Sequence, residues 1–227
     1  MSEFDAAYFE KNYADYSAQN PPRKLSHYHD AIRRRVDGDR SLSVLDVGCG
    51  LGLWADHLAH AEPDWSVSAS DVDADVIASN QSRFPNVSFT VARAGEGAPQ
   101  NRFDVLTAMD VLEHVPNVEA QFAELCRWLV PDGLFTFVVP VYDGPLGPIV
   151  RLLDKDPTHI HKWSRMRWVE LAERQLLDVE WHGLFRVMPP VGRYVHFPSA
   201  ALRQIAPAVF VSGRAKSVVE GQDSVSP

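Results

Sequence analysis

An acid and three evenly spaced glycines follow a short apolar run in the segment VLDVGCGLGLW. Asp46 stands at the tip of that run, and Gly48, Gly50 and Gly52 follow at every second position. Glycines there cost conformational entropy unless the backbone must turn sharply or let a ligand approach closely. A carboxylate at the same place repels phosphate and attracts a positive charge. The pattern therefore predicts a binding turn for a ligand with a cationic end.

A second acid, Asp71, ends the next apolar run, about 20 residues after Gly52, where dinucleotide-binding folds place the acid that binds ribose hydroxyls. The glycines follow GxGxG and not GxGxxG, and Asp46 would repel a pyrophosphate held at the helix N-terminus. The two acids predict a nucleoside without phosphate, joined to a cationic amino-acid part, which describes S-adenosylmethionine. The alternative for Asp71 is a helix-cap acid, since Asp73 also stands at a helix start.

The segment KDPTHIHKWS carries histidines that could move a proton. Asp156 precedes His159 by three residues and could orient its ring in a turn, whereas His161 would point to the opposite side of an extended loop. We therefore predict that His159 is the general base for a hydroxyl acceptor and that His161 contributes less. The alternative is a surface loop with structural histidines. A zinc pair is not predicted, because no third ligand lies near.

The segment MDVLEHV places Asp110, Glu113 and His114 at i, i+3 and i+4, on one face of a helical turn. Such a face could bind a divalent ion or polarise a substrate hydroxyl, with His114 as a further candidate base. The alternative, which we favour, is that Glu113 and His114 fix the loop by hydrogen bonds. No metal is predicted.

Alternating apolar and helical segments must position these residues, and they predict a parallel sheet built from right-handed crossovers. The predicted strands are 43–47, 65–70, 87–92, 103–108, 134–139, 178–187 and 208–215. The predicted helices are 3–20, 23–37, 51–61, 73–82, 118–130 and 164–176. We expect one domain over residues 1–215, with substrate-side loops at 141–163 and 189–206 and a frayed polar tail at 216–227.

The composition is that of a soluble globular domain of 227 residues. The net charge of -8 argues against a nucleic-acid partner, and the 2 cysteines form no disulfide framework. The sequence starts without a signal-peptide pattern and holds no apolar run of ~20 residues, so we expect a cytoplasmic protein without a membrane partner. We expect a small-molecule substrate; the oligomeric state is not predicted.

Four segments in order, VLDVGCGLGLW, SASDVDADVI, FDVLTAMDVLEHVPN and LVPDGLFTFVVP, resemble the class I S-adenosylmethionine-dependent methyltransferases. The similarity is greatest to the branch of ubiquinone-type O-methyltransferases and antibiotic-tailoring enzymes, and it is specific over residues 42–140. It implies a Rossmann-like three-layer α/β sandwich with a seven-stranded, mostly parallel sheet and a reversed last strand. It also implies that helices in residues 1–40 form a lid over the cofactor.

The resemblance implies roles for individual residues. The methionine end of the cofactor would lie on Asp46 and on the turn from Gly48 to Gly52, and the ribose would lie on Asp71. The remaining implied cofactor contacts are Cys49, Val72, Ala94, Gly95, Met109, Asp110, Tyr16 and Arg23. Of these, Val72, Ala94 and Gly95 would lie by the adenine, and Arg23 would bind the methionine carboxylate. Arg93 stands where the family usually has an acid that contacts adenine.

Methyl transfer to a hydroxyl oxygen of a small molecule is the function that these residues favour. Nitrogen and carbon acceptors stay open, as does a protein that binds the cofactor without turnover. A nicotinamide oxidoreductase is disfavoured by Asp46 and by the missing GxGxxG pattern. An RNA substrate is disfavoured by the acidic charge.

Overall fold

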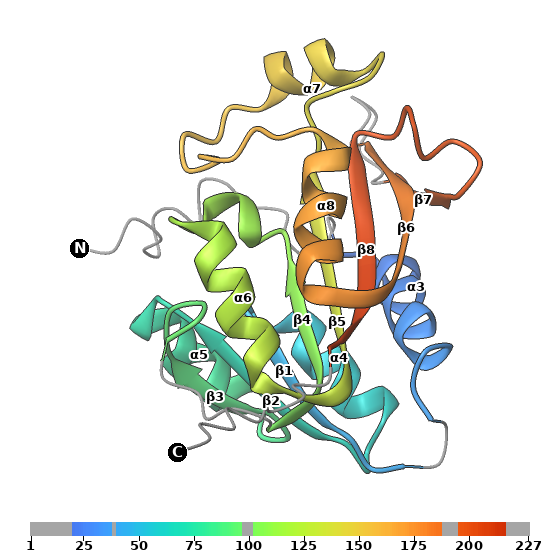
Figure 1. Cartoon of the computed structure of the whole chain (residues 1–227). Coiled ribbons are helices and arrows are strands. Elements are labelled where there is room, and N and C mark those ends of the chain that lie inside the picture. Colours follow the sequence, from blue (N-terminus) through green and yellow to red (C-terminus); the bar gives the residue numbers. More distant parts are fainter. Residues whose placement is uncertain (1–19, 38–39, 97–101, 188–194, 217–227) are drawn as a thin grey trace, which may run out of the picture.

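A computed structural model describes residues 20–37, 40–96, 102–187 and 195–216 of the chain (Figure 1). Its helices are α3 Pro22–Arg33, α4 Leu53–Ala61, α5 Ala74–Arg83, the short 3-10 helix η1 Leu112–His114, α6 Val118–Trp128, α7 Gly147–Leu153 and α8 Arg165–Gln175. Its strands are β1 Ser43–Val47, β2 Ser66–Asp71, β3 Ser88–Val91, β4 Phe103–Met109, β5 Leu129–Pro140, β6 Leu176–Val187, β7 Val195–Ser199 and β8 Ala208–Ala215. The predicted helix over residues 3–20 lies almost wholly outside the described residues.

The described strands form one sheet in the order β3-β2-β1-β4-β5-β8-β6-β7. The pairs from β3 to β5 are all parallel, and β8 runs antiparallel to both β5 and β6. The predicted α/β class and the reversed last strand are therefore confirmed. The predicted count of seven strands is wrong, because β7 forms within the proline-broken segment 189–206 and pairs antiparallel with β6.

Helices cover both faces of the sheet and make it the middle of three layers. Apolar side chains of α3 and α4 pack on one face, and those of α6 and α8 pack on the other. Figure 1 shows α6 and α8 in front of the strands. The central strand β4 contributes to both cores, because neighbouring residues point to opposite faces: Leu106 to one and Val105 to the other. Both of these side chains are fully buried.

Two segments have a different secondary structure from the one predicted. Pro131-Asp132-Gly133 stands between the predicted helix 118–130 and the predicted strand 134–139, but these residues lie within β5, which starts at Leu129. Asp132 has a φ of 64°, and the register of β5 against β4 shifts between Phe103 and Val105, so the turn is absorbed as an irregularity of the strand pairing. The predicted loop 141–163 contains the short helix α7. Within the described part of the chain, no helix has both the length and the apolarity needed to cross a bilayer.

The strand order creates a crevice at the centre of the sheet. β1 pairs with β2 on one side and with β4 on the other, so the chain leaves β1 and β4 towards opposite sides. In open α/β sheets, ligands bind at such a point, beyond the carboxyl ends of the strands. Asp46, Asp71 and Asp110 all lie at these strand ends.

Candidate active site

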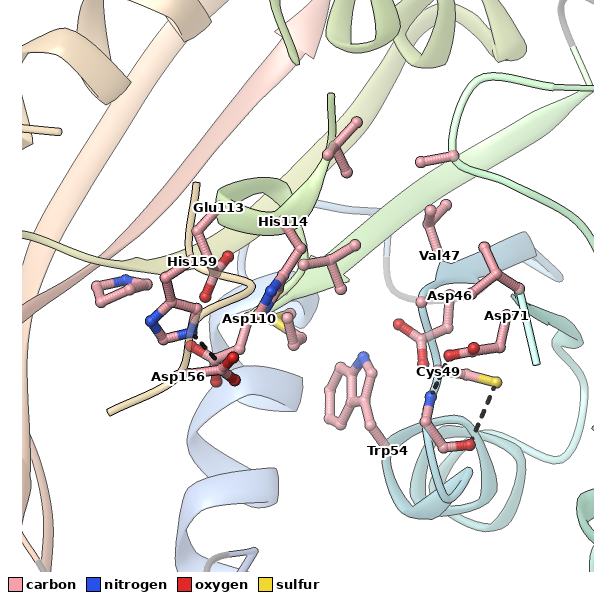
Figure 2. Close-up of a pocket in the computed structure, with 18 of the residues that line it drawn as sticks. Asp46, Val47, Cys49, Trp54, Asp71, Asp110, Glu113, His114, Asp156 and His159 are labelled. Carbon is pink, nitrogen blue, oxygen red and sulfur yellow. Dashed lines mark hydrogen bonds and ion pairs between the residues drawn. The ribbon is translucent and has the colours of Figure 1, made fainter. Parts of the chain in front are cut away.

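A cavity of about 790 Å³ lies at this crevice. Figure 2 shows Asp46 and Asp71 on one side of it and Asp110, His114 and His159 on the other. Segments far apart in the sequence line it: α3, the turns after β1, β2 and β4, and the loop after β5. It is large enough, and polar at both ends, for a cofactor and a second molecule to share.

The glycine turn is held open by left-handed backbone conformations. Gly48, Gly50 and Gly52 have φ values of 68°, 49° and 76°. The Gly50 N–H donates to Asp71 Oδ2 at 2.9 Å, and its carbonyl accepts from the Asn80 side chain at 2.7 Å. Gly52 is the N-cap of α4 and does not line the cavity, unlike Gly48 and Gly50. The predicted glycine turn is therefore present, with Gly48 and Gly50 facing the cavity.

Asp46 is buried beneath the turn, with 2% of its surface exposed. Its Oδ1 accepts from the Thr107 hydroxyl at 2.7 Å, and that hydroxyl accepts from the Trp54 indole N–H at 3.1 Å. Burial raises the pKa of Asp46 to about 7, partly opposed by the Thr107 bond, and nearby Asp71 raises it further. A buried carboxyl with one neutral donor suits a ligand that brings positive charge or hydrogen-bond donors.

Asp71 and Asp73 have separate tasks. Asp73 caps α5, where its Oδ1 accepts from the Asp75 and Val76 N–H groups at 2.9 Å, and it does not line the cavity. Asp71 lines the cavity, and its Oδ1 accepts from the Asp73 N–H at 3.1 Å. Burial raises the pKa of Asp71, against the backbone bonds that it accepts. The helix-cap alternative therefore applies to Asp73 and not to Asp71.

We expect Gly48→Ala to lower both cofactor affinity and stability. A Cβ at Gly48 would lie 2.6 Å from a methyl carbon of Val111, on a backbone with a φ of 68°. The left-handed conformation alone costs about 1–2 kcal/mol for a residue with a side chain. Gly144→Ala is the matched control, because Gly144 also has a φ of 68° and a crowded Cβ position, but lies outside the cavity lining. Thermal unfolding should show a loss for both variants, and calorimetry should show weaker cofactor binding for Gly48→Ala alone. Equal cofactor affinity in the two variants would contradict this assignment of the turn.

Several other predicted cofactor residues lie at the cavity. Those that line it are Cys49, Val72, Ala94, Met109 and Asp110. Gly95 does not line it; it has a φ of 81°, and a Cβ at this position would clash with Gln121 Oε1. Arg93, in place of the acid found in the family, is a lining residue.

The structure places Lys24, and not the predicted Arg23, at the cavity. Tyr16 lies outside the described residues, and Arg23 is exposed and absent from the cavity lining. Lys24, the next residue of α3, is 6% exposed and lines the cavity. Burial lowers its pKa to about 8, although Asp110 acts to raise it. The cation that α3 presents to this site is Lys24.

Asp110 lines the cavity, and its charge interacts with two cations, Arg186 and Lys24. Its backbone has a φ of 60°, unusual for a residue with a side chain, and Arg186 Nη1 donates to its Oδ1 at 2.6 Å. Burial would raise the pKa of Asp110, but Arg186 and Lys24 outweigh it and hold the pKa below its ordinary value. Asp110 therefore stays ionised, and Arg186 is a site residue that sequence reasoning missed.

Glu113, His114 and His159 meet at the far end of the cavity (Figure 2). One ligand atom from each lies within 4.8 Å of the others, the one grouping among the described residues with the spacing of a metal site. Glu113 is 1% exposed, and burial followed by Asp110 raises its pKa well above the ordinary value. The His114 Nδ1 lies 2.9 Å from the Thr158 hydroxyl and 3.1 Å from the Thr158 carbonyl, and burial lowers its pKa to about 4. The raised pKa of Glu113 favours its protonated form, and the lowered pKa of His114 leaves its imidazole neutral at neutral pH.

His159 and His161 point to opposite sides of their loop, as predicted. His159 lines the cavity. His161 does not; its Nε2 lies 2.8 Å from the Val115 carbonyl, and its ring packs 4.9 Å from that of Trp163. The prediction of His161 as a catalytic candidate is therefore wrong, because its ring is used in packing the loop against the core.

The structure also corrects the expected partner of His159. Asp154 Oδ1 lies 2.9 Å from His159 Nδ1, whereas the nearest approach of Asp156 is 3.9 Å, from its Oδ2 to His159 Nε2. Asp156 instead accepts from the Thr158 N–H at 2.9 Å. An acid five residues before a histidine gives no local sequence signal, since the turn between them decides the contact.

Comparisons with known proteins agree with this geometry. A family model described as a methyltransferase domain matches residues 10–185. An uncharacterized methyltransferase of Mycobacterium tuberculosis is 35% identical over 196 residues, covering 84% of this chain and 90% of its own. A ubiquinone biosynthesis O-methyltransferase of a Bradyrhizobium species is 26% identical over 182 residues, 69% of this chain and 68% of its own. A Thermotoga maritima structure, described as an S-adenosylmethionine-dependent methyltransferase and possible histamine N-methyltransferase, superposes with a TM-score of 0.70 at 12% identity, over 92% of this chain and 97% of that one.

Proposed function

Because this chain belongs to the class I S-adenosylmethionine-dependent methyltransferases, we propose that it transfers a methyl group to a hydroxyl oxygen of a small molecule. One observation carries the proposal: a single cavity joins the Asp46 and Asp71 turn to the His159 imidazole. Relatives named as ubiquinone biosynthesis O-methyltransferases support an oxygen acceptor.

The residues of the turn fit the cofactor. Asp46 and Asp71 are buried at 2% and 7% exposure, and burial raises the pKa of both. Buried carboxyls of this kind gain from donors and positive charge that a ligand supplies. Asp71 would accept from the ribose hydroxyls, Asp46 would face the cationic amino-acid part, and Lys24 would bind the methionine carboxylate. When bound, S-adenosylmethionine supplies a methyl group attached to a sulfonium, which leaves as a neutral thioether.

The opposite end of the cavity would bind the acceptor and remove its proton. His159 Nε2 would accept the hydroxyl proton, and the nearby Asp156 carboxylate, 3.9 Å away, would favour the imidazolium that forms. The protein otherwise aligns the two molecules, and alignment can contribute roughly 7–11 kcal/mol to lowering a barrier.

Calorimetry with S-adenosylmethionine and with its homocysteine product tests the cofactor half of the proposal. A panel of hydroxylated aromatics, sugars and acyl carriers with radiolabelled methyl donor tests the acceptor half. Absence of heat with either cofactor form would overturn the first half. Methylation of nitrogen or carbon acceptors alone would overturn the second.

We expect cofactor affinity to rise with pH up to about 7 and then to level off. The pKa of Asp46 is raised to about 7 in the folded protein, so most of this carboxyl is protonated at pH 6. A cation favours its ionised form, and binding at pH 6 should therefore release a proton. Calorimetry in buffers of different ionisation enthalpy measures this release, and Asp46→Asn should abolish it. Binding at pH 6 with no buffer dependence would contradict the role of Asp46.

The raised pKa of Asp46 also determines how the stability of the folded protein changes with pH. Because the folded-state pKa of Asp46 lies above its unfolded value, the folded protein binds more protons between about pH 4 and 7. Asp46 therefore favours folding below its unfolded pKa, and this contribution is lost as the pH rises through 7.

A further inference from the structure

The loop after β5 contains a hydrogen-bonded cluster around Asp154, whose side chain is 7% exposed. Its Oδ2 accepts from the Tyr142 hydroxyl at 2.7 Å and from Lys162 Nζ at 2.8 Å. Its Oδ1 lies 2.9 Å from His159 Nδ1. Two donors thus fix one oxygen of the carboxylate and aim the other at the imidazole.

These contacts decide which nitrogen of His159 carries the hydrogen. The Tyr142 hydroxyl, 3.0 Å from Nδ1, gives its own hydrogen to Asp154 and can only accept from the ring. Asp154 is an acceptor as well, so a bare Nδ1 would face lone pairs on both partners. The hydrogen therefore sits on Nδ1, and Nε2 keeps the lone pair that a base needs.

We propose that Asp154 is a positioning residue that holds His159 in the Nδ1–H tautomer, with Tyr142 and Lys162 holding Asp154 in turn. The contacts stand on their own, and their catalytic meaning rests on the proposed function. Asp154 also lines the cavity, but the role proposed for it is to act through the imidazole, as the third group of a nucleophile–base arrangement does.

The Asp154 carboxyl is ionised at neutral pH. Burial would raise the pKa of this carboxyl, but the bonds from Lys162 and Tyr142 outweigh burial and hold the pKa at about 2. Lys162, with 33% of its side chain exposed, connects the cluster to solvent. An acceptor that stays ionised keeps the tautomer of His159 constant with pH as long as the ring is neutral.

Nitrogen-15 NMR of the histidine rings, recorded with a chelator present, tests this assignment without any acceptor molecule. The His159 signals are identified by their loss in His159→Gln among the 9 histidines of the chain. We expect the Nδ1–H tautomer in the wild-type protein and a mixture of tautomers in Asp154→Ala. Tyr142→Phe leaves Asp154 as an acceptor at Nδ1, so we expect the wild-type tautomer in it. The wild-type spectrum itself tests the assignment if Asp154→Ala does not fold.

Lys162→Met is the matched control, because it removes a donor to Oδ2 and leaves the contact between Oδ1 and His159 in place. We expect the wild-type tautomer in this variant. An Nε2–H tautomer in the wild-type protein, or an unchanged tautomer in Asp154→Ala, would overturn the proposal.

Turnover separates this proposal from the proposed function. With an accepted substrate, Asp154→Ala should lower kcat by about tenfold or more, and by no more than the loss of His159 itself, at unchanged cofactor affinity. If the NMR spectra show the expected tautomers but no acceptor is methylated, the result would count against the proposed function alone. Methylation by a protein with the Nε2–H tautomer would count against Asp154 alone.

Discussion

His159→Ala should lower turnover by about a hundredfold or more, the range expected for loss of a general base. Cofactor affinity should stay within a few-fold, because His159 lies at the far end of the cavity from Asp46 and Asp71 (Figure 2). Initial rates with radiolabelled S-adenosylmethionine and calorimetry with its homocysteine product measure the two quantities separately.

His161→Ala is the matched control for this variant, since it removes an imidazole from the same loop. Its ring contacts the Val115 carbonyl and Trp163, so we expect a loss of stability and a much smaller loss of turnover. His114→Ala tests the neighbouring imidazole. Near wild-type turnover in both His159→Ala and His114→Ala would mean that neither histidine is the base, and a carbon or nitrogen acceptor would then explain the reaction better.

Asp71→Ala should weaken cofactor binding by at least about tenfold. Each hydrogen bond to a charged group contributes about 1.5–3 kcal/mol, and a loss of 1.4 kcal/mol is tenfold in affinity. The variant loses the acceptor for the ribose, and it also loses the bond of 2.9 Å that holds the Gly50 N–H in the turn. Because the missing acceptor and the loosened turn would both weaken binding of the cofactor, we expect Asp71→Ala to have the largest effect on cofactor affinity.

Asp73→Ala separates the ribose contact from the capping of α5. Loss of that N-cap should cost about 1 kcal/mol of stability, with cofactor affinity unchanged. Asp71→Asn keeps the shape of the side chain and should show an intermediate affinity. Unchanged affinity in Asp71→Ala would show that the ribose is held by other residues.

The cofactor side could be predicted because its signals are local. An apolar strand, an acid at its tip and glycines at every second position specify the turn around Gly48 without reference to the rest of the chain. The strand that ends at Asp71 carries the same kind of signal. Such patterns depend on backbone conformation and strand burial, which a short segment determines by itself.

The acceptor side depends on contacts between distant residues, and the sequence does not show them. Arg186 pairs with Asp110 across 76 positions, and Asp154 reaches His159 only because the loop turns between them. The difference between Arg23 and Lys24 depends on the register of α3. Lys24 lies one turn before the buried Tyr28 and shares its face, which is the signal that could have selected it.

The position of β8 has a consequence for the order in which the chain folds. Among the described strands, β8 lies between β5 and β6 although it follows both in the sequence, so β6 and β7 join this sheet only through β8. During translation the strands from β1 to β5 can pair as they emerge, while the free edge of β5 waits for residues 208–215. Pairings between distant segments form slowly, and unpaired strand edges are prone to aggregate. The half with the glycine turn can therefore assemble first, and Arg186 of β6 reaches Asp110 only after β8 has joined the sheet.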